Sequence, residues 1–182
     1  MPLKEVTHPA LDIDLRYATP DNFTQQQIYH HARAYLHQDA LTALVRAAEL
    51  ASAQGLRLRL LDAYRPSVAQ WRLWATLPDP RFVADPRLGS IHTRGVAVDL
   101  TLCSASGTPL AMGTEFDEMT PASCHGNTAI AASAQQHRCL LLGIMTLAGW
   151  THHPYEWWHY NLPDPTRYPL LRDEVEGACL MD

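Results

Sequence analysis

Apolar and polar positions follow two different rhythms in the first half of the chain. Over residues 39–54 the apolar side chains recur every three or four positions, which predicts an amphipathic helix, and Gly55 stands where a C-terminal cap belongs. Residues 56–60 then alternate leucine with arginine, which is the pattern of a strand with one buried face. After that strand, Pro66 can open a short second helix that runs to about Trp74.

The second half of the chain mixes the same two kinds of element. Residues 96–102 form a nearly continuous apolar run, which predicts a strand buried on both faces. A helix is predicted over 128–148, and the aromatic segment 150–160 is predicted to be a strand with a bend near Pro154. Because helices and strands do not alternate regularly, we expect an α+β fold with a mainly antiparallel sheet flanked by helices.

Length and charge limit the classes of protein to consider. The 182 residues fit one domain, 1–182, and no Gly/Ser linker or low-complexity tract divides them. A formal net charge of −5 without a basic run argues against a nucleic-acid partner and gives no reason to expect binding to an anionic membrane. The sequence leaves open whether the chain forms a homo-oligomer.

The cysteines and the apolar segments indicate a location. The start of the chain has no apolar signal core, and the longest apolar stretch, 139–150, is too short to span a bilayer. We therefore expect a cytoplasmic protein. Four cysteines without C-x-x-C spacing are then expected to be free thiols, mostly buried, and not zinc ligands: Cys103, Cys124, Cys139 and Cys179.

Two short segments carry side chains that suit a catalytic zinc ion, which takes three protein ligands and keeps a fourth position open. His92 and Asp99 are seven residues apart, so they can converge only if the chain turns between them at Gly95. Glu156 and His159 are three apart, a separation that a helical turn or a bent strand brings side by side. Each pair alone is common, and His159 by itself is more simply explained as a histidine of an aromatic cluster.

The combination of the two segments matches a known pattern. Segment 90–99 carries S-x-H-x-x-G-x-A-x-D and segment 156–159 carries E-x-W-H, which resembles the signature of the zinc D-Ala-D-Ala peptidases. That group is related in fold to the lysostaphin-type peptidases and the hedgehog signalling domain. Further segments resemble the D-alanyl-D-alanine dipeptidases of the vancomycin-resistance type, namely 15–19, 21–24, 62–66 and 113–117. The matches run from about residue 11 to 162, and the connection 78–89 is shorter than in the best-known members.

The resemblance implies roles for the residues that match. It implies one zinc ion per chain, held by His92, Asp99 and His159. Two neutral imidazoles and one carboxylate leave such an ion with net positive charge, which is enough to activate water. Glu156 is then the catalytic base, and Arg65 is the cation that stabilises the oxyanion.

The remaining matched residues are expected around the substrate. Asp62 can hold the Arg65 guanidinium, although an ordinary ion pair or a turn cap explains it nearly as well. The resemblance implies that Asp117 binds the terminal ammonium of the substrate, with Tyr17 and Ser90 as further polar contacts. A turn residue in a glycine-containing loop is the alternative interpretation of Asp117.

The implied function is hydrolysis of D-alanyl-D-alanine to two D-alanines. The nearest alternative is a peptidoglycan D,D-carboxypeptidase or endopeptidase with the same metal site, which the short chain and the expected location disfavour. A zinc-stabilised binding module is a second alternative, but it would need neither Glu156 nor Arg65. The chain has no G-x-S-x-G elbow, and Cys124 cannot face its neighbour His125 as a catalytic dyad. Antibiotic resistance, D-alanine scavenging and cell-wall recycling all stay open as physiological roles.

Overall fold

The structure is a computed structural model that describes residues 3–171 and 180–181. The helices and strands within these residues are, in chain order, β1 Leu3–Glu5, β2 Leu11–Ile13, η1 Arg16–Ala18, β3 Tyr35–His37, α1 Gln38–Ser52, β4 Leu56–Asp62, α2 Ser67–Thr76, η2 His92–Arg94, β5 Ala97–Ser104, η3 Pro121–Ser123, α3 Ala132–Leu147, β6 Thr151–His153, β7 Glu156–Asn161 and η4 Pro165–Arg167, where η marks a short 3-10 helix. Among the described residues, no helix has the length and apolar character needed to cross a bilayer.

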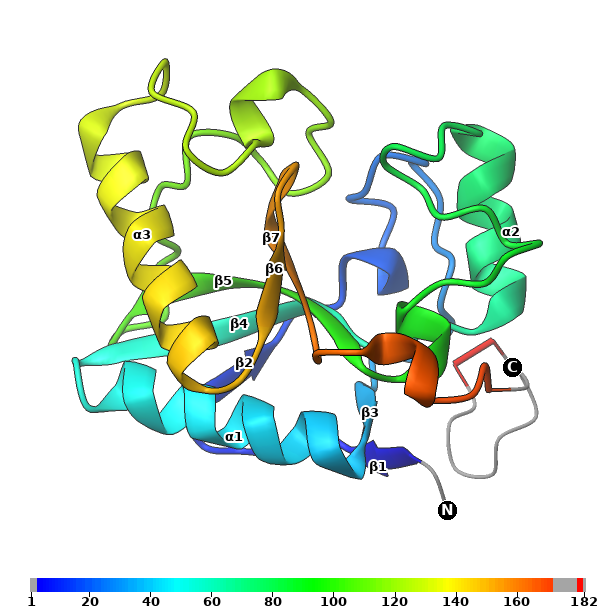
Figure 1. Ribbon diagram of the computed structural model, residues 1–182, viewed down its shortest axis with the longest axis horizontal. Helices are drawn as coiled ribbons and strands as arrows, with labels where there is room; N and C mark the ends of the chain where they lie inside the picture. The colour runs from blue at the N-terminus through cyan, green and yellow to red at the C-terminus, as the bar shows by residue number, and fades with distance from the viewer. Residues whose placement is uncertain (1–2, 172–179, 182) are drawn as a thin grey trace.

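A five-stranded sheet in the order β2-β4-β5-β7-β6 forms the centre of the molecule (Figure 1). β2 runs parallel to β4, and every other neighbouring pair in this sheet is antiparallel. β1 and β3 form a separate antiparallel pair beside it. This arrangement confirms the predicted α+β fold with a mainly antiparallel sheet.

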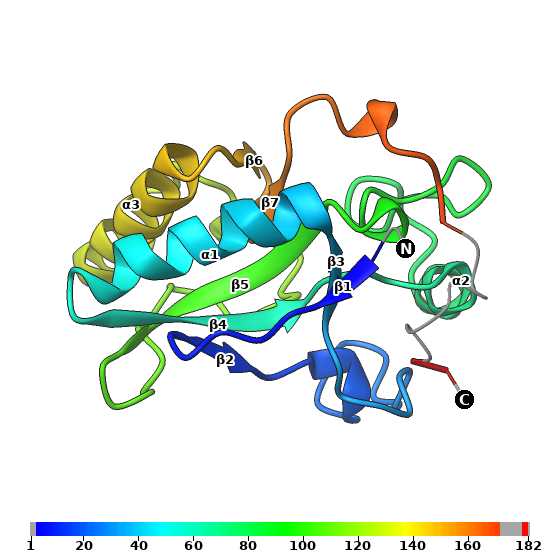
Figure 2. The same ribbon diagram turned by 90° about the horizontal axis from the view of Figure 1, so that it is seen from below.

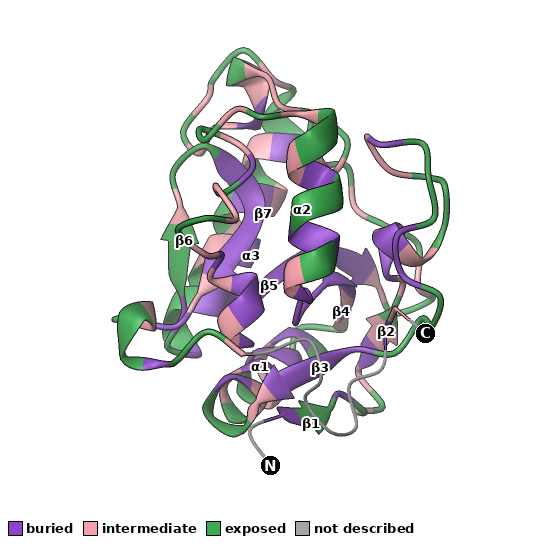
Figure 3. Cartoon of the chain, turned by 90° about the vertical axis from the view of Figure 1, so that its right-hand side faces the viewer, coloured by how far each residue is buried: buried purple, intermediate pink, exposed green. Residues whose placement is uncertain are grey.

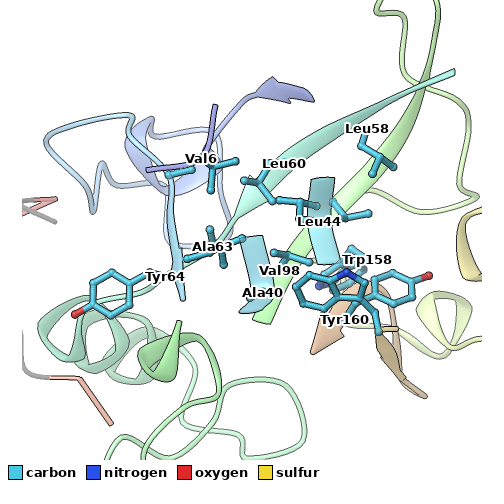
Figure 4. Packing of buried hydrophobic residues seen from close by; sticks show 14 of the residues in the cluster. Val6, Ala40, Leu44, Leu58, Leu60, Ala63, Tyr64, Val98, Trp158 and Tyr160 are labelled. Atoms are coloured by element: carbon cyan, nitrogen blue, oxygen red, sulfur yellow. The ribbon is translucent and has the colours of Figure 1, made fainter. Parts of the chain in front are cut away.

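Two helices cover one face of the sheet, and α2 lies apart from them. Seen from below, α1 runs alongside β5 and β4 (Figure 2). It contacts β4 and α3, and α3 in turn contacts β6. Leu44 of α1 is fully buried among Leu60 of β4 and Val98 of β5, and Trp158 and Tyr160 of β7 extend the same core (Figure 4). Burying a side chain of this size contributes about 1.5–3 kcal/mol, so this layer fixes the sheet that carries the site.

Residues at both ends of helix α1 account for where it begins and ends. His37 accepts a hydrogen bond from the backbone N–H of Asp39 at its N-terminus, and Gly55, with a φ of +71°, follows its C-terminus. Helix α2 begins directly after Pro66, as predicted, and shows a buried stripe that includes Gln70 beside an exposed outer face (Figure 3).

Three sequence predictions need correction. Segment 150–160 is not one bent strand, because β6 and β7 form a hairpin that turns at Pro154 and Tyr155. The predicted helix 128–148 begins only at Ala132. Of the three cysteines that the structure describes, Cys103 is buried, Cys124 is half-buried and Cys139 is exposed, so the expectation of mostly buried thiols was wrong. Cys179 lies outside the described residues.

Candidate metal and catalytic site

Three adjacent strands place acidic and imidazole side chains opposite one another. Asp99 of β5 pairs with His159 of β7 on one side and with Asp62 of β4 on the other. An unbroken register would place Val98 opposite Asp62, but the register of β4 shifts between Leu60 and Asp62. A bulge of this kind moves a side chain to the other face of a sheet, and here it turns Asp62 from the core toward Asp99.

His92 reaches the same place from a tight turn just before β5. It opens the 3-10 helix η2, which ends at Gly95 in the left-handed conformation with a φ of +70°. A Cβ atom on Gly95 would lie 2.7 Å from Cδ2 of Leu3 and 3.2 Å from the backbone nitrogen of His37. The turn that the sequence predicted at Gly95 is therefore present, and the packing around it leaves no room for a side chain.

Ligand atoms of three buried residues converge at this point. Nε2 of His92 lies 3.2 Å from Nδ1 of His159 and 3.4 Å from Oδ2 of Asp99, and Nδ1 of His159 lies 3.1 Å from Oδ1 of Asp99. Nδ1 of His92 is 2.7 Å from the carbonyl oxygen of Ala63, a contact in which the ring nitrogen donates. That hydrogen bond fixes the tautomer and leaves the lone pair of Nε2 directed at the other two residues.

These three residues fit a metal ion. Among the described residues they are the one group of three or more histidine, cysteine or acidic side chains whose ligand atoms lie close enough together, all within 4.8 Å. Two imidazole nitrogens and a carboxylate oxygen form a ligand set that suits zinc in a catalytic site. Burial alone would raise the pKa of Asp99, but the neighbouring imidazoles lower it below its ordinary range, so this carboxylate is ionised.

Glu156 lies next to the three candidate ligands but outside their group. The β6–β7 register passes from the pair His152–Tyr160 directly to the pair His153–Glu156, so the alternation of faces along β7 is interrupted. As a result Oε2 of Glu156 lies 3.9 Å from Nδ1 of His159, although the two residues are an odd number apart. Burial, and secondly the charge of Asp99, raise the pKa of Glu156 to about 8.

Arg65 is held rigidly under the site. Its Nε donates to Oδ2 of Asp62 at 2.9 Å and its Nη1 donates to Oε1 of Gln70 at 2.9 Å, while Nη2 lies 3.6 Å from Asp99. Tyr29 donates to the second oxygen of Asp62 at 2.8 Å. Asp62 therefore holds the Arg65 guanidinium by a buried ion pair.

Asp117 brings a further carboxylate to the site from the loop after β5, and Tyr17 of η1 contacts it. The Tyr17 hydroxyl donates to Oδ2 of Asp117 at 2.7 Å, and Asp117 itself has a φ of +59°. Burial, followed by the charge of Asp99, raises the pKa of Asp117 well above its ordinary value. A cation placed beside Asp117 would restore the charged form.

One cavity of about 140 Å³ is lined by the three candidate ligands together with Glu156, Arg65, Asp117 and Tyr17, but not by Asp62. Ser90 is also in the lining, where its hydroxyl accepts a hydrogen bond from the backbone N–H of His92. Trp158 also lines the cavity, whereas its neighbour Trp157 faces away and donates to Thr114. The structure thus brings together every site residue that the sequence singled out.

The lining also contains residues that sequence reasoning missed. One of them is His153, which is half-buried and whose Nδ1 lies 3.8 Å from Oε2 of Glu156. Recognition of the hairpin turn at Pro154 would have placed it beside Glu156. Part of the short connection 78–89 also lines the cavity, from Pro80 to Ala84.

Comparison with known proteins gives consistent results. The model of the M15 peptidase family described as D-Ala-D-Ala dipeptidase matches residues 1–175. The chain is 46% identical over 169 residues to a D-alanyl-D-alanine dipeptidase of Escherichia coli (strain K12), covering 93% of this chain and 88% of the relative. It is also similar to D-alanyl-D-alanine dipeptidases of Enterococcus faecium, with 33% identity over 183 residues, and of Streptomyces coelicolor, with 35% over 179. These alignments cover 89% and 85% of this chain, and 90% and 89% of the respective relatives.

Proposed function

Since the chain belongs to the D-Ala-D-Ala dipeptidase family of the M15 peptidases and is a metallopeptidase-type hydrolase, we propose that it hydrolyses D-alanyl-D-alanine to two D-alanines with one bound zinc ion. The observation that carries the proposal is the meeting of three kinds of group in one small cavity. These groups are a metal ligand set, a separate buried carboxylate in Glu156, and a carboxylate suited to an ammonium in Asp117.

In this proposal His92, Asp99 and His159 hold the zinc ion. In such a site, zinc supplies Lewis-acid polarisation of the carbonyl and activation of water. The protein's own part is to keep the ligands ready for binding. Ala63 fixes the tautomer of His92, and the buried position of Asp99 between two imidazoles keeps it charged.

Glu156 is the proposed general base. It accepts the proton of the attacking water and passes it to the amine nitrogen that leaves when the peptide C–N bond breaks. Its position outside the ligand group leaves its carboxylate oxygens available for this proton. A cation in the neighbouring ligand group favours the ionised form that a base needs, against the burial that raises its pKa.

Arg65 is the proposed stabiliser of the oxyanion that forms when water adds to the carbonyl. Its guanidinium is buried in the cavity wall and is already held by Asp62 and Gln70, so it needs little reorganisation during the reaction. The negative charge that develops on the substrate would meet a preorganised cation there.

Asp117 is the proposed partner of the free ammonium of the substrate, with Tyr17 and Ser90 as further polar contacts. A cavity of about 140 Å³ is smaller than the ~300–1,000 Å³ of ordinary ligand pockets, which favours a very small substrate. Because the cavity wall already contains the buried carboxylates Asp99 and Glu156, a positively charged substrate end offsets an unfavourable concentration of negative charge.

We also propose a cytoplasmic location. The three cysteines that the structure describes are unpaired thiols, a state that the reducing cytoplasm preserves. A free dipeptide is a substrate that can be met there, whereas whole peptidoglycan lies outside the membrane.

The proposal is tested by capping the substrate amine. Acetylation removes the ammonium charge and adds bulk where Asp117 lies, so kcat/KM for N-acetyl-D-Ala-D-Ala should be lower than for D-Ala-D-Ala by a factor on the order of 10² or more. Asp117→Asn should reduce this preference, chiefly by slowing the free dipeptide. The measurement is kcat/KM for both substrates with the zinc-loaded enzyme, with the exposed Asp21→Asn as the control variant.

The same measurement can overturn the proposal. Similar kcat/KM values for the capped and uncapped substrates would show that the dipeptidase assignment is wrong and would favour a D,D-carboxypeptidase. If the folded, zinc-loaded protein hydrolyses no D,D-peptide, a zinc-stabilised binding module would be the remaining interpretation.

A further inference from the structure

The short connection between α2 and η2 contains one tripeptide twice. Asp-Pro-Arg stands at 79–81 and again at 85–87, and both copies fold into the same turn. In each copy the aspartate carbonyl oxygen accepts hydrogen bonds from the backbone N–H groups three and four residues later. In each copy the aspartate carboxylate also binds the backbone N–H and the guanidinium of its own arginine. The two arginines, Arg81 and Arg87, are therefore held in equivalent local structures.

The two turns differ in their position relative to the site. The cavity lining includes the first turn from Pro80 to Ala84 but no residue from 85 to 87. Val83 anchors the first turn in the core with 3% of its surface exposed. Gln70 then links this turn to the site, because it donates to the carbonyl oxygen of Ala84 at 2.7 Å and accepts from Arg65. Arg81 is thus an exposed arginine on a fixed part of the cavity rim.

The guanidinium of Arg81 has N–H donors that are free to bind a ligand. Its Nε and Nη2 bind Asp79, and its Nη1 has no hydrogen-bond partner among the described residues. The guanidinium lies 5.4 Å from the ring centre of Phe82, another residue of the lining, and its side chain is 75% exposed. An arginine carries five N–H donors in a planar fork, so an arginine paired with one carboxylate can still bind a second one.

A free dipeptide brings two charges to the cavity, an ammonium and a carboxylate. The guanidinium groups among the described residues of the lining belong to Arg65 and Arg81. Arg65 is buried and already bound to Asp62 and Gln70, and the proposed function uses it for the oxyanion. Building on that proposed function, we propose that Arg81 binds the free α-carboxylate of the substrate and so selects peptides in which a single residue follows the scissile bond.

The test compares two substrates that differ only at the carboxyl end, D-Ala-D-Ala and its C-terminal carboxamide. With zinc-loaded enzyme, Arg81→Gln should lower kcat/KM for the free acid about tenfold, mainly through KM, because one charge-assisted hydrogen bond is lost. Its effect on the carboxamide should be small, since that substrate presents no charge. Arg81→Lys should recover part of the loss. Arg87→Gln, which removes the matched arginine outside the lining, should leave both substrates unchanged.

The four values of kcat/KM for wild type and Arg81→Gln form a thermodynamic cycle that isolates the pairing of Arg81 with the carboxylate. An equal loss on both substrates, or no loss on either, with an active wild type would overturn the assignment of Arg81 alone. If wild-type enzyme with bound zinc does not hydrolyse D-Ala-D-Ala at all, the proposed function fails first, and the role of Arg81 fails with it.

Discussion

At the scale of single residues, the site is defined by three carboxylates that line one cavity, of which Asp99 and Glu156 are buried and Asp117 is half-buried. Asp99, Asp117 and Glu156 differ in their protonation: the imidazoles beside Asp99 lower its pKa, whereas burial raises the pKa values of Asp117 and Glu156. Groups that share a cavity and differ in this way can take different parts in proton transfer. The carboxylate that ionises most readily lies among the candidate metal ligands, and those that hold protons lie around it.

The role of Glu156 gives the first prediction at this scale. Glu156→Gln keeps the shape of the side chain but cannot accept a proton, so kcat for D-Ala-D-Ala should fall by about 10²–10⁴ while zinc still binds. The measurement is kcat together with the zinc content of the purified variant. Glu49→Gln, an exposed substitution on α1, serves as the control. A near-normal kcat in the variant would assign the proton transfer to another residue.

At the scale of elements, the sequence predicted the long, periodic segments and missed the short ones. In β4 the alternation of leucine and arginine was sufficient to predict a strand, and in α1 the apolar spacing was sufficient to predict a helix. Each of these patterns extends over many residues. β1, β2 and β3 contain three residues each, and a segment of that length carries no periodicity. Their pairing depends on long-range contacts that no local pattern encodes.

The irregular elements are the ones that build the site. The turn at Gly95 was predictable, because two residues of a motif on opposite faces of a strand require a turn between them. The register shift that turns Asp62 and the interrupted β6–β7 pairing that turns Glu156 were not predictable in the same way. A bulge has no sequence signal of its own here, since the residues around it have ordinary strand composition.

The turn before β5 gives the prediction at this scale, because two glycines have nearly the same φ but different surroundings. Gly55, at +71°, has no atom within 4 Å of an added Cβ, whereas Gly95, at +70°, is in close contact with Leu3 and His37. Gly55→Ala should therefore cost about 1–2 kcal/mol of the free energy of unfolding from backbone strain alone. Gly95→Ala should cost a further ~1–3 kcal/mol, as overpacking does.

Urea denaturation of both variants measures this difference. Gly95→Ala should also weaken zinc binding, because His92 lies in the same turn, whereas Gly55→Ala should bind zinc as the wild type does. Equal destabilisation by the two substitutions would show that the packing around Gly95 relaxes without cost.

At the scale of the whole molecule, the site joins parts of the chain that are far apart in sequence. The candidate ligands come from η2, β5 and β7, Arg65 follows β4, Tyr17 comes from η1, and Asp117 comes from the loop after β5. The sequence revealed these residues through motifs, which carry no distances. The rim of the cavity was not predictable from the motifs, because the connection 78–89 matches none of them. Its contact with the cavity depends on Val83 and Gln70.

Because the candidate ligands lie on three separate elements, zinc binding should stabilise the whole fold. A ligand that binds only the folded state adds RT ln(1 + [L]/Kd), which is about 4.1 kcal/mol at a free zinc concentration of 1,000 Kd. For a chain of this size that corresponds to a rise in Tm of roughly 8–16 °C, reversed by a chelator. The buried negative charge of Asp99 acts in the same direction, since the folded protein without a metal must hold it without a nearby divalent cation. The measurement is Tm with zinc and with chelator for wild type, His159→Ala and the exposed His30→Ala. The Tm of His30→Ala should respond to zinc as the wild type does, and that of His159→Ala should lose most of the response. A wild-type Tm that changes with neither zinc nor chelator would rule out these residues as a tight metal site.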